Sequence, residues 1–225
     1  MRAMILAAGF GERLKPLTLL KPKALLSIDG KPLIVRIIGQ LALAGIKDIV
    51  INLGYRGSLL KKYLGDGSSL SVRIQYSQEP EDAPLDTGAG IAKALPLLGH
   101  KPFVVVSADI WTDFGFHQLL HTSPQFIVVP KPEGYHGDFA LEGNKLSQHA
   151  AASYTYANMG VFDPRWFASF KKERFPLSQV MYHAIEHDLV KGVCYQGAWF
   201  NVGTLDVIED VRTHLYGIHD TAKLP

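Results

Sequence analysis

The sequence predicts an α/β fold, a Rossmann-like mixed and mostly parallel sheet with helices on both faces. Apolar segments of strand length alternate along the chain with segments of helical spacing, and this alternation is typical of strands joined by helical crossovers. The first apolar run, 4–8, stops at Gly9-Phe-Gly11, as a buried strand does when it ends in a ligand-binding loop. With 225 residues, 47% of them hydrophobic, the chain can bury the core of one domain over 1–225.

Composition and charge exclude several classes of protein. The 23 Lys and Arg residues nearly balance the 21 Asp and Glu residues, whereas a general nucleic-acid binder needs a dense basic surface. The chain has no apolar run of the roughly 20 residues that cross a membrane, and no signal-peptide pattern at its start. The single cysteine, Cys194, cannot form an internal disulfide, which favours a cytoplasmic location. We therefore expect neither a nucleic-acid nor a membrane partner.

The first half of the chain carries the clearest alternation. Strands are expected over 25–28, 48–53, 72–76 and 103–106, and helices from Pro32 to just before Gly45, over 57–64 and over 91–98. The strand at 103–106 is apolar at every position, so we expect it at the centre of the sheet. The segment 77–84 is acidic and contains two prolines, which predicts a loop.

The second half is expected to continue the pattern with shorter elements. Strands are expected over 126–129, 157–162 and 193–196, a hairpin at Glu142-Gly-Asn144, and a helix over 177–188. Thr204 is expected to cap a final helix, with Asp206 in its first turn. The helix dipole favours a negative charge at that position.

Two cations bracket the glycine loop. Gly9 and Gly11 permit positive φ angles and close backbone contact, so their amides can form an anion-binding nest. Arg13 and Lys23 add the positive charge that neutralises an extended polyphosphate. A dinucleotide fingerprint would place a third glycine where this chain has Leu14, and no Gly-Lys-Ser/Thr follows for a Walker loop. The pattern therefore indicates a nucleotide site of another kind.

The whole opening motif carries a resemblance to a known family. Leu6-Ala-Ala-Gly-x-Gly-x-Arg-Leu-x-Pro-Leu-Thr-x(3)-Pro-Lys-x-Leu25 resembles the start of sugar-1-phosphate nucleotidyltransferases. Ile110-Trp-Thr-Asp-Phe114 is similar to the Val-Trp-Thr-Asp-Tyr of bacterial N-acetylmuramate-1-phosphate uridylyltransferases. The resemblance covers nearly the whole chain. It implies the nucleotidyltransferase type of fold, with a nucleotide-binding part over about 1–112 and a sugar-binding part over about 113–225.

The resemblance implies a reaction and its catalytic residues. UTP and a sugar 1-phosphate would give a UDP-sugar and pyrophosphate, and the most specific substrate is N-acetylmuramate 1-phosphate, which gives UDP-N-acetylmuramate in peptidoglycan recycling. Arg13 would hold the departing pyrophosphate, and Lys23 would neutralise the α-phosphate. Asp109 would bind Mg²⁺, which prefers carboxylate and phosphate oxygens. Relatives carry Gly where this chain has Ala108, and a second Asp ligand where it has Asn201.

The resemblance also assigns the substrate contacts. The residues expected to contact the nucleotide are Ala8, Gly9, Gly11, Arg13, Lys23, Glu79, Thr87 and Gly88, and those expected to contact the sugar are Ser107, Asp138 and Asn158. Glu79 stands where many relatives carry a Gln that reads a pyrimidine, and its carboxylate could accept from the N3–H of uracil or thymine. The spacing alone fits a second role for two of these residues. Thr87 could equally be a helix cap, and Asp138 could equally be a surface turn residue, rather than contacts to substrate.

Two alternatives stay open. A dTTP:glucose-1-phosphate or GTP:mannose-1-phosphate transferase would share the first motif and differ in its choice of base. A catalytically impaired protein that binds nucleotide sugars is the second alternative, because Ala108 and Asn201 depart from the pattern of the family. The sequence does not predict the oligomeric state.

Overall fold

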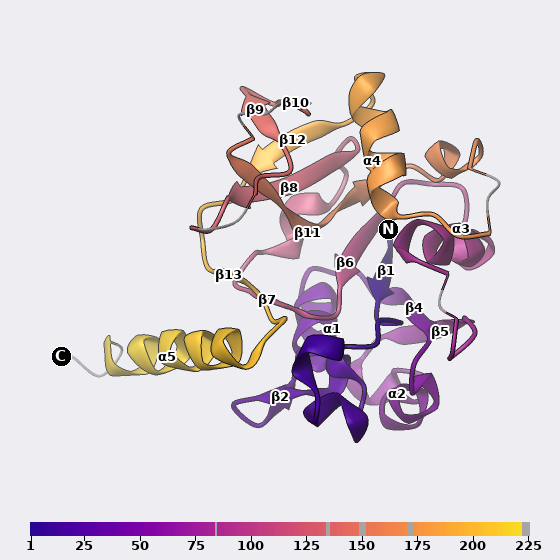
Figure 1. Cartoon of the computed structure of the whole chain (residues 1–225). Coiled ribbons are helices and arrows are strands. Elements are labelled where there is room, and N and C mark those ends of the chain that lie inside the picture. Colours follow the sequence, from indigo (N-terminus) through magenta and orange to yellow (C-terminus); the bar gives the residue numbers. More distant parts are fainter. Residues whose placement is uncertain (84, 134–135, 149–151, 171–172, 222–225) are drawn as a thin grey trace.

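The computed structural model describes residues 1–83, 85–133, 136–148, 152–170 and 173–221, with side chains as far as Gly217. Its centre is a seven-stranded sheet in the order β12-β8-β11-β6-β1-β4-β5 (Figure 1). The strands are β1 Arg2–Leu6, β4 Asp48–Leu53, β5 Arg73–Gln78, β6 Phe103–Ser107, β8 Gln125–Pro130, β11 Tyr154–Phe162 and β12 Lys191–Cys194. Neighbouring strands run parallel except where β11 pairs antiparallel with β6 and β8. The predicted mixed, mostly parallel sheet is confirmed, and β6 lies at its centre as expected.

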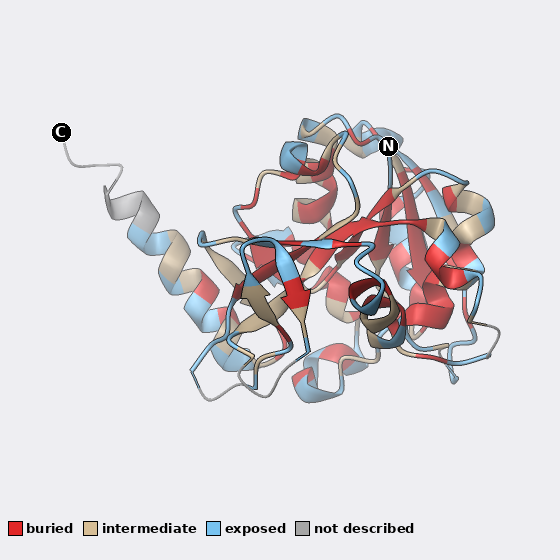
Figure 2. Ribbon diagram, turned by 90° about the horizontal axis from the view of Figure 1, so that it is seen from above, coloured by how far each residue is buried: buried red, intermediate tan, exposed pale blue. Residues whose placement is uncertain are grey.

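Helices cover both faces of the sheet. They are α1 Leu33–Leu43, α2 Gly57–Leu64, α3 Thr87–Leu98, α4 Leu177–Glu186 and α5 Leu205–Thr221. Because side chains of a strand alternate between faces, Ala3 and Ile5 of β1 join the core under α1 and α2. Met4 points the other way and joins the core under α3 and α4. Figure 2 shows the resulting buried strands between the two layers of helices.

Three two-stranded sheets and short 3₁₀ turns complete the fold. The small sheets are β2 Ser27–Ile28 with β3 Lys31–Pro32, β7 Ile110–Thr112 with β13 Trp199–Asn201, and β9 Ala140–Glu142 with β10 Lys145–Ser147. The 3₁₀ turns are Glu12–Leu14, Leu17–Leu19, Lys23–Leu25, Ser68–Leu70, Phe116–Leu119 and Pro164–Phe167. The β9–β10 pair confirms the hairpin expected at Glu142-Gly-Asn144.

Several boundaries differ from the expectation. The strand expected over 25–28 begins only at Ser27, because Lys23–Leu25 forms a 3₁₀ turn. Pro32 ends β3 and caps α1 rather than starting the helix. The strand expected at 193–196 lies two residues earlier, at Lys191–Cys194. The loop expected over 77–84 starts after Gln78, and Pro84 lies outside the described residues.

The helix expected over 91–98 begins one turn earlier, at Thr87. The Asp86 carboxylate accepts a hydrogen bond from the Thr87 backbone N–H (2.7 Å) and caps the helix. Thr87 is therefore the first helical residue and not the cap. Gly88 and Gly90, expected in a loop, lie in the first turn of α3.

Helix α5 leaves the body of the molecule as an arm (Figure 1). A third hydrophobic cluster, which includes Trp111, Val202, Ile208 and Val211, holds its first turns against β7 and β13. Asp206 lies in its first turn, as expected. Among the helices described, none combines the length and the apolarity needed to cross a membrane.

Candidate active site

The carboxyl ends of β1 and β6 lie side by side. The two strands are parallel, with Leu6 opposite Ser107. The glycine loop 7–11 follows β1, and Asp109 follows β6, so both segments emerge at the same edge. Ligands of open α/β sheets bind outside the carboxyl ends of the strands. The sheet thus brings together two motifs that are far apart in the sequence.

The glycine loop is open at one glycine and packed at the other. Gly9 is exposed, and a Cβ there would meet no atom within 4 Å. Gly11 has a φ of +66°, and a Cβ there would lie 2.8 Å from Cγ2 of Thr18 and 3.2 Å from Cβ of Lys23. Ala8, before them, is buried. The loop therefore has accessible backbone at Gly9 and a fixed turn at Gly11.

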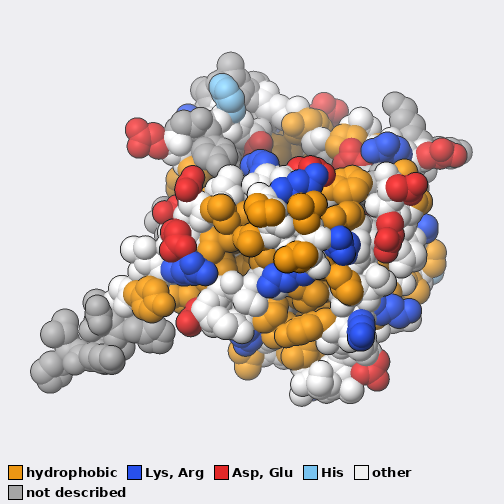
Figure 3. Space-filling model, turned by 60° about the horizontal axis from the view of Figure 1, so that its bottom comes forward, with side chains coloured by type: hydrophobic (Ala, Val, Ile, Leu, Met, Phe, Trp, Pro, Cys, Tyr) orange, Lys and Arg blue, Asp and Glu red, His pale blue; other side chains and the backbone are white. Residues whose placement is uncertain are grey.

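Several basic residues follow this loop closely in the sequence: Arg13, Lys15, Lys21 and Lys23. Figure 3, which brings the bottom of Figure 1 forward, shows Lys and Arg side chains interspersed with hydrophobic ones, while Asp and Glu lie mostly towards the margin. The segment 12–23, which follows the loop, also exposes the apolar side chains of Leu19 and Leu20. Such a distribution favours the approach of an anion such as a triphosphate.

Lys23 and Asp109 form an ion pair across the sheet edge. The Lys23 Nζ donates to Asp109 Oδ2 at 2.6 Å, and the two side chains are 13% and 32% exposed. The cation expected to bind the α-phosphate and the carboxylate expected to bind Mg²⁺ therefore meet directly. Substrate that binds Lys23, or a metal that binds Asp109, would therefore meet a group that already has one partner.

Asn201 and Arg13 lie close to the same pair, Asn201 through the backbone of β13 and Arg13 through its guanidinium. The Val202 N–H donates to the Asp109 carbonyl oxygen (2.9 Å), and Asn201 pairs with Ile110 between β13 and β7. Arg13 lies against Gly203, the residue after Val202, because a Cβ on Gly203 would be 2.8 Å from the Arg13 guanidinium. Gly203 thus makes room for Arg13. Both cations and both expected metal ligands lie around one edge of the sheet.

The Ile110-Trp-Thr-Asp-Phe114 segment supports that cluster. The Trp111 ring packs against Phe200 of β13, with 5.7 Å between ring centroids. The Thr112 hydroxyl donates to the Ala198 carbonyl oxygen at 2.8 Å. The Tyr195 hydroxyl donates to the Asp113 carboxylate, and burial together with this bond raises the pKa of Tyr195 to about 12. These contacts hold β13, and with it Asn201, beside the segment that carries Asp109.

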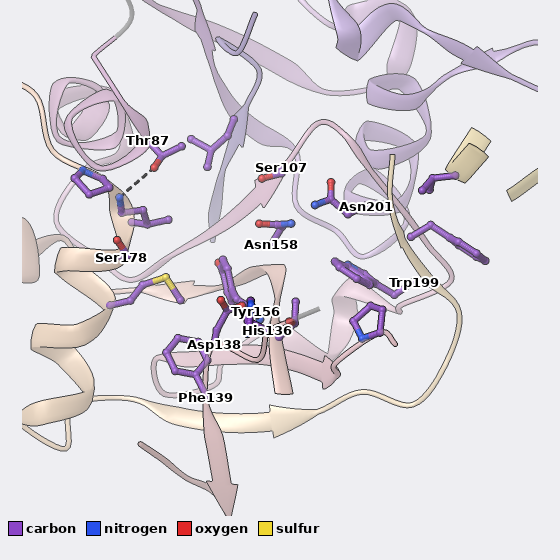
Figure 4. Close-up of a pocket in the computed structure, with 18 of the residues that line it drawn as sticks. Thr87, Ser107, His136, Asp138, Phe139, Tyr156, Asn158, Ser178, Trp199 and Asn201 are labelled. Atoms are coloured by element: carbon purple, nitrogen blue, oxygen red, sulfur yellow. Dashed lines mark hydrogen bonds between the residues drawn. The ribbon is translucent and has the colours of Figure 1, made fainter. Parts of the chain in front are cut away.

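A cavity of about 680 Å³ adjoins the cluster (Figure 4). Five of the expected site residues line it: Thr87, Ser107, Asp138, Asn158 and Asn201. They come from α3, β6, the segment before β9, β11 and β13. The other walls are largely apolar and aromatic, as in most small-molecule sites. The structure therefore gathers all three expected sugar contacts around one space.

A distortion of β11 places Asn158 in this cavity. Asn158 has a φ of +56°, and the pairing of β11 with β8 shifts register between Tyr156 and Gly160. The Trp199 indole N–H donates to the carbonyl oxygen of the bulged Ala157 at 2.8 Å. A left-handed residue inside a strand is unusual, and such strain concentrates at functional sites.

Asp138 and Thr87 also hold parts of the wall together. The Asp138 carboxylate accepts from the Tyr156 backbone N–H at 2.8 Å, next to the bulge. The Thr87 hydroxyl accepts from the Leu177 N–H at 3.1 Å and so joins the start of α3 to the start of α4 (Figure 4). Each side chain therefore both lines the cavity and fixes its shape.

The sequence did not indicate several cavity residues. Tyr156 lies two positions before Asn158 on β11, and Trp199 lies two before Asn201 on β13, so their closeness in sequence to expected site residues could have suggested both. Ser178 and Met181 of α4 carried no such signal, because their exposure to the cavity depends on how α4 packs. Within the part of the chain that the structure describes, the buried Tyr156 hydroxyl has no hydrogen-bond partner.

Glu79 and Gly88 lie outside the cavity lining. Glu79 is 2% exposed, and its two carboxylate oxygens accept from the side-chain N–H of Asn52 (2.7 Å) and the backbone N–H of Leu85 (2.9 Å). The Gly88 N–H donates to the Phe175 carbonyl oxygen at 3.1 Å. Their expected contacts with the nucleotide stay predictions, and for Glu79 the observed bonds offer a competing role.

The donor set suits a hard divalent cation. Over the described ranges, no cluster of three or more His, Cys, Asp or Glu side chains could hold a metal ion. Asp109 offers a carboxylate, and Asn201 an amide oxygen on the adjacent strand. Mg²⁺ commonly binds one or two protein oxygens and takes its remaining ligands from water and substrate phosphates. The pair fits that pattern.

Comparison with known proteins agrees with this geometry. The family model described as nucleotidyl transferase matches residues 2–125. An N-acetylmuramate alpha-1-phosphate uridylyltransferase of Neisseria meningitidis serogroup B is 37% identical over 94% of this chain and 97% of its own length. A mannose-1-phosphate guanyltransferase of Hypocrea jecorina is 32% identical over 100% of this chain and 73% of its own length.

A solved structure supports the fold independently. A putative glucose-1-phosphate thymidylyltransferase of Bacillus anthracis, in complex with a sucrose, superposes with a TM-score of 0.85 at 18% identity, over 95% of this chain and 94% of that chain. The sequence match and the arrangement of the glycine loop, Lys23 and Asp109 at one sheet edge lead to the same conclusion: the chain belongs to the nucleotidyl transferase family.

Proposed function

We propose that this enzyme transfers the uridylyl group of UTP to a sugar 1-phosphate and releases pyrophosphate. The observation that carries the proposal is that Lys23 pairs with Asp109 and Arg13 lies against Gly203, while Asn201, two residues before Gly203, lines the cavity of the expected sugar contacts. The 37% identity to the N. meningitidis uridylyltransferase favours N-acetylmuramate 1-phosphate as the sugar substrate. The product would be UDP-N-acetylmuramate, formed in the cytoplasm as part of peptidoglycan recycling.

The protein would contribute positioning and charge. A phosphate oxygen of the sugar 1-phosphate attacks the α-phosphorus of UTP, and the bond to the pyrophosphate oxygen breaks. Lys23 would neutralise the α-phosphate, Arg13 would hold the pyrophosphate, and Gly9 and Gly11 would present backbone amides. Preorganised charges and donors of this kind lower the barrier without covalent catalysis. In this scheme the nucleotide binds the part over about 1–112 and the sugar the part over about 113–225.

Asp109 and Asn201 would hold Mg²⁺ together with the phosphates. The metal would neutralise charge on the triphosphate. Binding would free Asp109 from Lys23, and the Lys23 ammonium would then be available to the substrate. Ser107, Asp138 and Asn158 would hydrogen-bond the sugar, since they line the cavity beside this edge.

The test is pyrophosphate release from a matrix of substrates. UTP, dTTP, GTP and CTP are each paired with the 1-phosphates of N-acetylmuramate, N-acetylglucosamine, glucose and mannose. The expected result is the highest kcat/KM for UTP with N-acetylmuramate 1-phosphate. A clear preference for another sugar would overturn the choice of acceptor, and a preference for another triphosphate would overturn the choice of UTP.

Three alternatives have specific support. The GTP-dependent alternative rests on the similarity to the H. jecorina guanyltransferase, and the dTTP-dependent one on the sequence motif that such enzymes share. The alternative of a catalytically impaired binding protein rests on Ala108 and on Asn201 in place of a second carboxylate. Binding of a UDP-sugar with no pyrophosphate release from any pair would favour that last alternative.

A further inference from the structure

A buried chain of hydrogen bonds joins the ends of three neighbouring strands. The Ala7 backbone N–H donates to Asn52 Oδ1 at 2.7 Å. Asn52 Nδ2 donates to Glu79 Oε1 at 2.7 Å, and the Leu85 backbone N–H donates to Glu79 Oε2 at 2.9 Å. The Asn52 and Glu79 residues are 3% and 2% exposed. The chain therefore runs through the protein interior from the end of β1, past β4 and β5, to the segment before α3.

The direction of these bonds dictates the chemistry of the two side chains. Both ends of the chain are backbone donors, at Ala7 and Leu85. An amide such as Asn52 accepts at one end and donates at the other, so position 79 must accept at both ends. A carboxylate accepts through both of its oxygens, whereas an amide has one oxygen and one NH₂ group that only donates. Two buried donors that face each other would each lose a hydrogen bond, which is costly.

The chain ends in the two segments that surround the nucleotide in the proposed function. Ala7 opens the glycine loop, and Leu85 precedes Asp86, which caps α3. The first turn of α3 packs directly on the pair, because a Cβ on Gly90 would lie 2.5 Å from Glu79 Oε1 and 3.3 Å from Asn52 Nδ2. Glycine at position 90 thus lets the helix approach.

We propose that Asn52 and Glu79 are a positioning pair for UTP. The pair holds the glycine loop and the segment before α3 at a fixed separation, so that the triphosphate and base enter a preformed site. Preorganisation of this kind raises affinity because binding need not order the loops. Glu79 acts through these loops and does not read the base. The inference rests on the proposed function and deepens it.

The decisive test is an exchange of the two side-chain types. Glu79→Gln leaves two donors facing each other, and Asn52→Asp leaves two carboxylates facing each other. In the double variant Asn52→Asp/Glu79→Gln, the carboxylate at position 52 accepts from Ala7 and from the amide at position 79. The oxygen of that amide accepts from Leu85, so every bond is restored, and only the central bond between positions 52 and 79 reverses its direction.

Each single variant is expected to raise KM for UTP about tenfold or more, in line with the cost of an unpaired buried group. KM for the sugar 1-phosphate should change less than threefold, and the double variant should return to within about threefold of the native KM for UTP. Glu81→Gln, the same change at an exposed position, is the matched control and should match the native protein. Circular dichroism and thermal unfolding confirm that each variant is folded.

Three results would overturn the inference. The first is native KM for UTP in both single variants. The second is a loss of active fraction and Tm with no change in either KM, which would mean that the pair only stabilises the fold. The third is a change in UTP-over-CTP preference in Glu79→Gln that the double variant does not restore, which would mean that Glu79 reads the base.

Gly90→Ala provides a separate test in case the double variant does not fold. Gly90→Ala displaces Glu79 Oε1 without changing either side chain, and it should also raise KM for UTP while sparing KM for the sugar 1-phosphate. Unchanged KM for UTP in Gly90→Ala would contradict the inference. Failure of the proposed function is recognised separately, because the native protein would then show no reaction with UTP. The same single and double variants would in that case be measured with the triphosphate that does react.

Discussion

At the scale of single residues, the account depends on charges that face one another. Lys23 and Asp109 are paired at 2.6 Å while both retain some exposure. Ion pairs with this much access to solvent contribute little to stability. Their closeness is therefore better explained by the chemistry of the site than by the needs of the fold, and substitutions there should change turnover far more than stability.

Lys23→Ala is expected to lower kcat/KM by about 10²-fold or more, because a lost preorganised charge at a phosphoryl centre typically costs a few kcal/mol. Thermal unfolding should be nearly unchanged. Lys21→Ala, which removes a charge two residues away, is the matched control and should retain native kinetics. Near-native turnover of Lys23→Ala would show that Lys23 does not contact the reacting phosphates.

Asn201→Asp should tighten the metal site. Asp109 with Asn201 presents a charge of −1, and a second carboxylate would make it −2, which a hard cation binds more strongly. The half-saturating Mg²⁺ concentration for pyrophosphate release should fall several-fold, while Asp109→Asn should nearly abolish release. The measurement is a Mg²⁺ titration at saturating substrates. Superimposable curves for native protein and Asn201→Asp would mean that position 201 does not face the metal.

At the scale of elements, two short structures do most of the positioning. The β7–β13 pair carries Asn201 to the backbone of the segment that contains Asp109. The start of α3 packs on the Asn52–Glu79 pair and, through Thr87, on α4. Both structures are held by contacts between segments distant in the sequence, so their geometry is a property of the whole fold.

The start of α3 also holds a strained residue. Asp86 has φ 68° and ψ 162°, a conformation that glycine adopts readily and other residues adopt at a cost of about 1–3 kcal/mol. Glycine caps a helix only a few tenths of a kcal/mol less well than Asp, although its flexibility stabilises the unfolded chain. Asp86→Gly should therefore raise the free energy of unfolding by about 1 kcal/mol.

Urea denaturation of the native protein, Asp86→Gly and Asp86→Ala measures this effect. Asp86→Ala keeps the strained backbone and loses the cap, so it should be less stable than the native protein by about 1 kcal/mol. If Asp86→Gly were destabilised to the same degree as Asp86→Ala, the cap rather than the strain would dominate at this position.

At the scale of the whole molecule, local patterns in the sequence predicted the sheet and the position of the glycine loop after its first strand. Apolar runs and helical spacing identify the strands and helices, because burial on two faces leaves a signal in neighbouring residues. The glycine loop, Arg13 and Lys23 lie within about 15 residues of one another, so they can be recognised as a motif in the sequence. Of the strand order, only the central place of β6 was predicted, and the antiparallel position of β11 between β6 and β8 was not.

The remainder depends on contacts that no local pattern records. The burial of Glu79 needs Asn52 from another strand and a glycine at position 90. The left-handed Asn158 needs the bulge between β11 and β8 and the bond from Trp199. Each of these features is a meeting of distant segments, so each could be found only in the folded chain.

The measurement that tests the central claim most directly follows the α-phosphate itself. UTP labelled with ³²P at the α-position is incubated with N-acetylmuramate 1-phosphate, Mg²⁺ and the native protein. The account predicts that the label moves entirely into UDP-N-acetylmuramate, with one unlabelled pyrophosphate released for each sugar nucleotide formed, and that Asp109→Asn forms almost none. Label that stayed in UTP, or appeared in UMP with no sugar nucleotide formed, would contradict it.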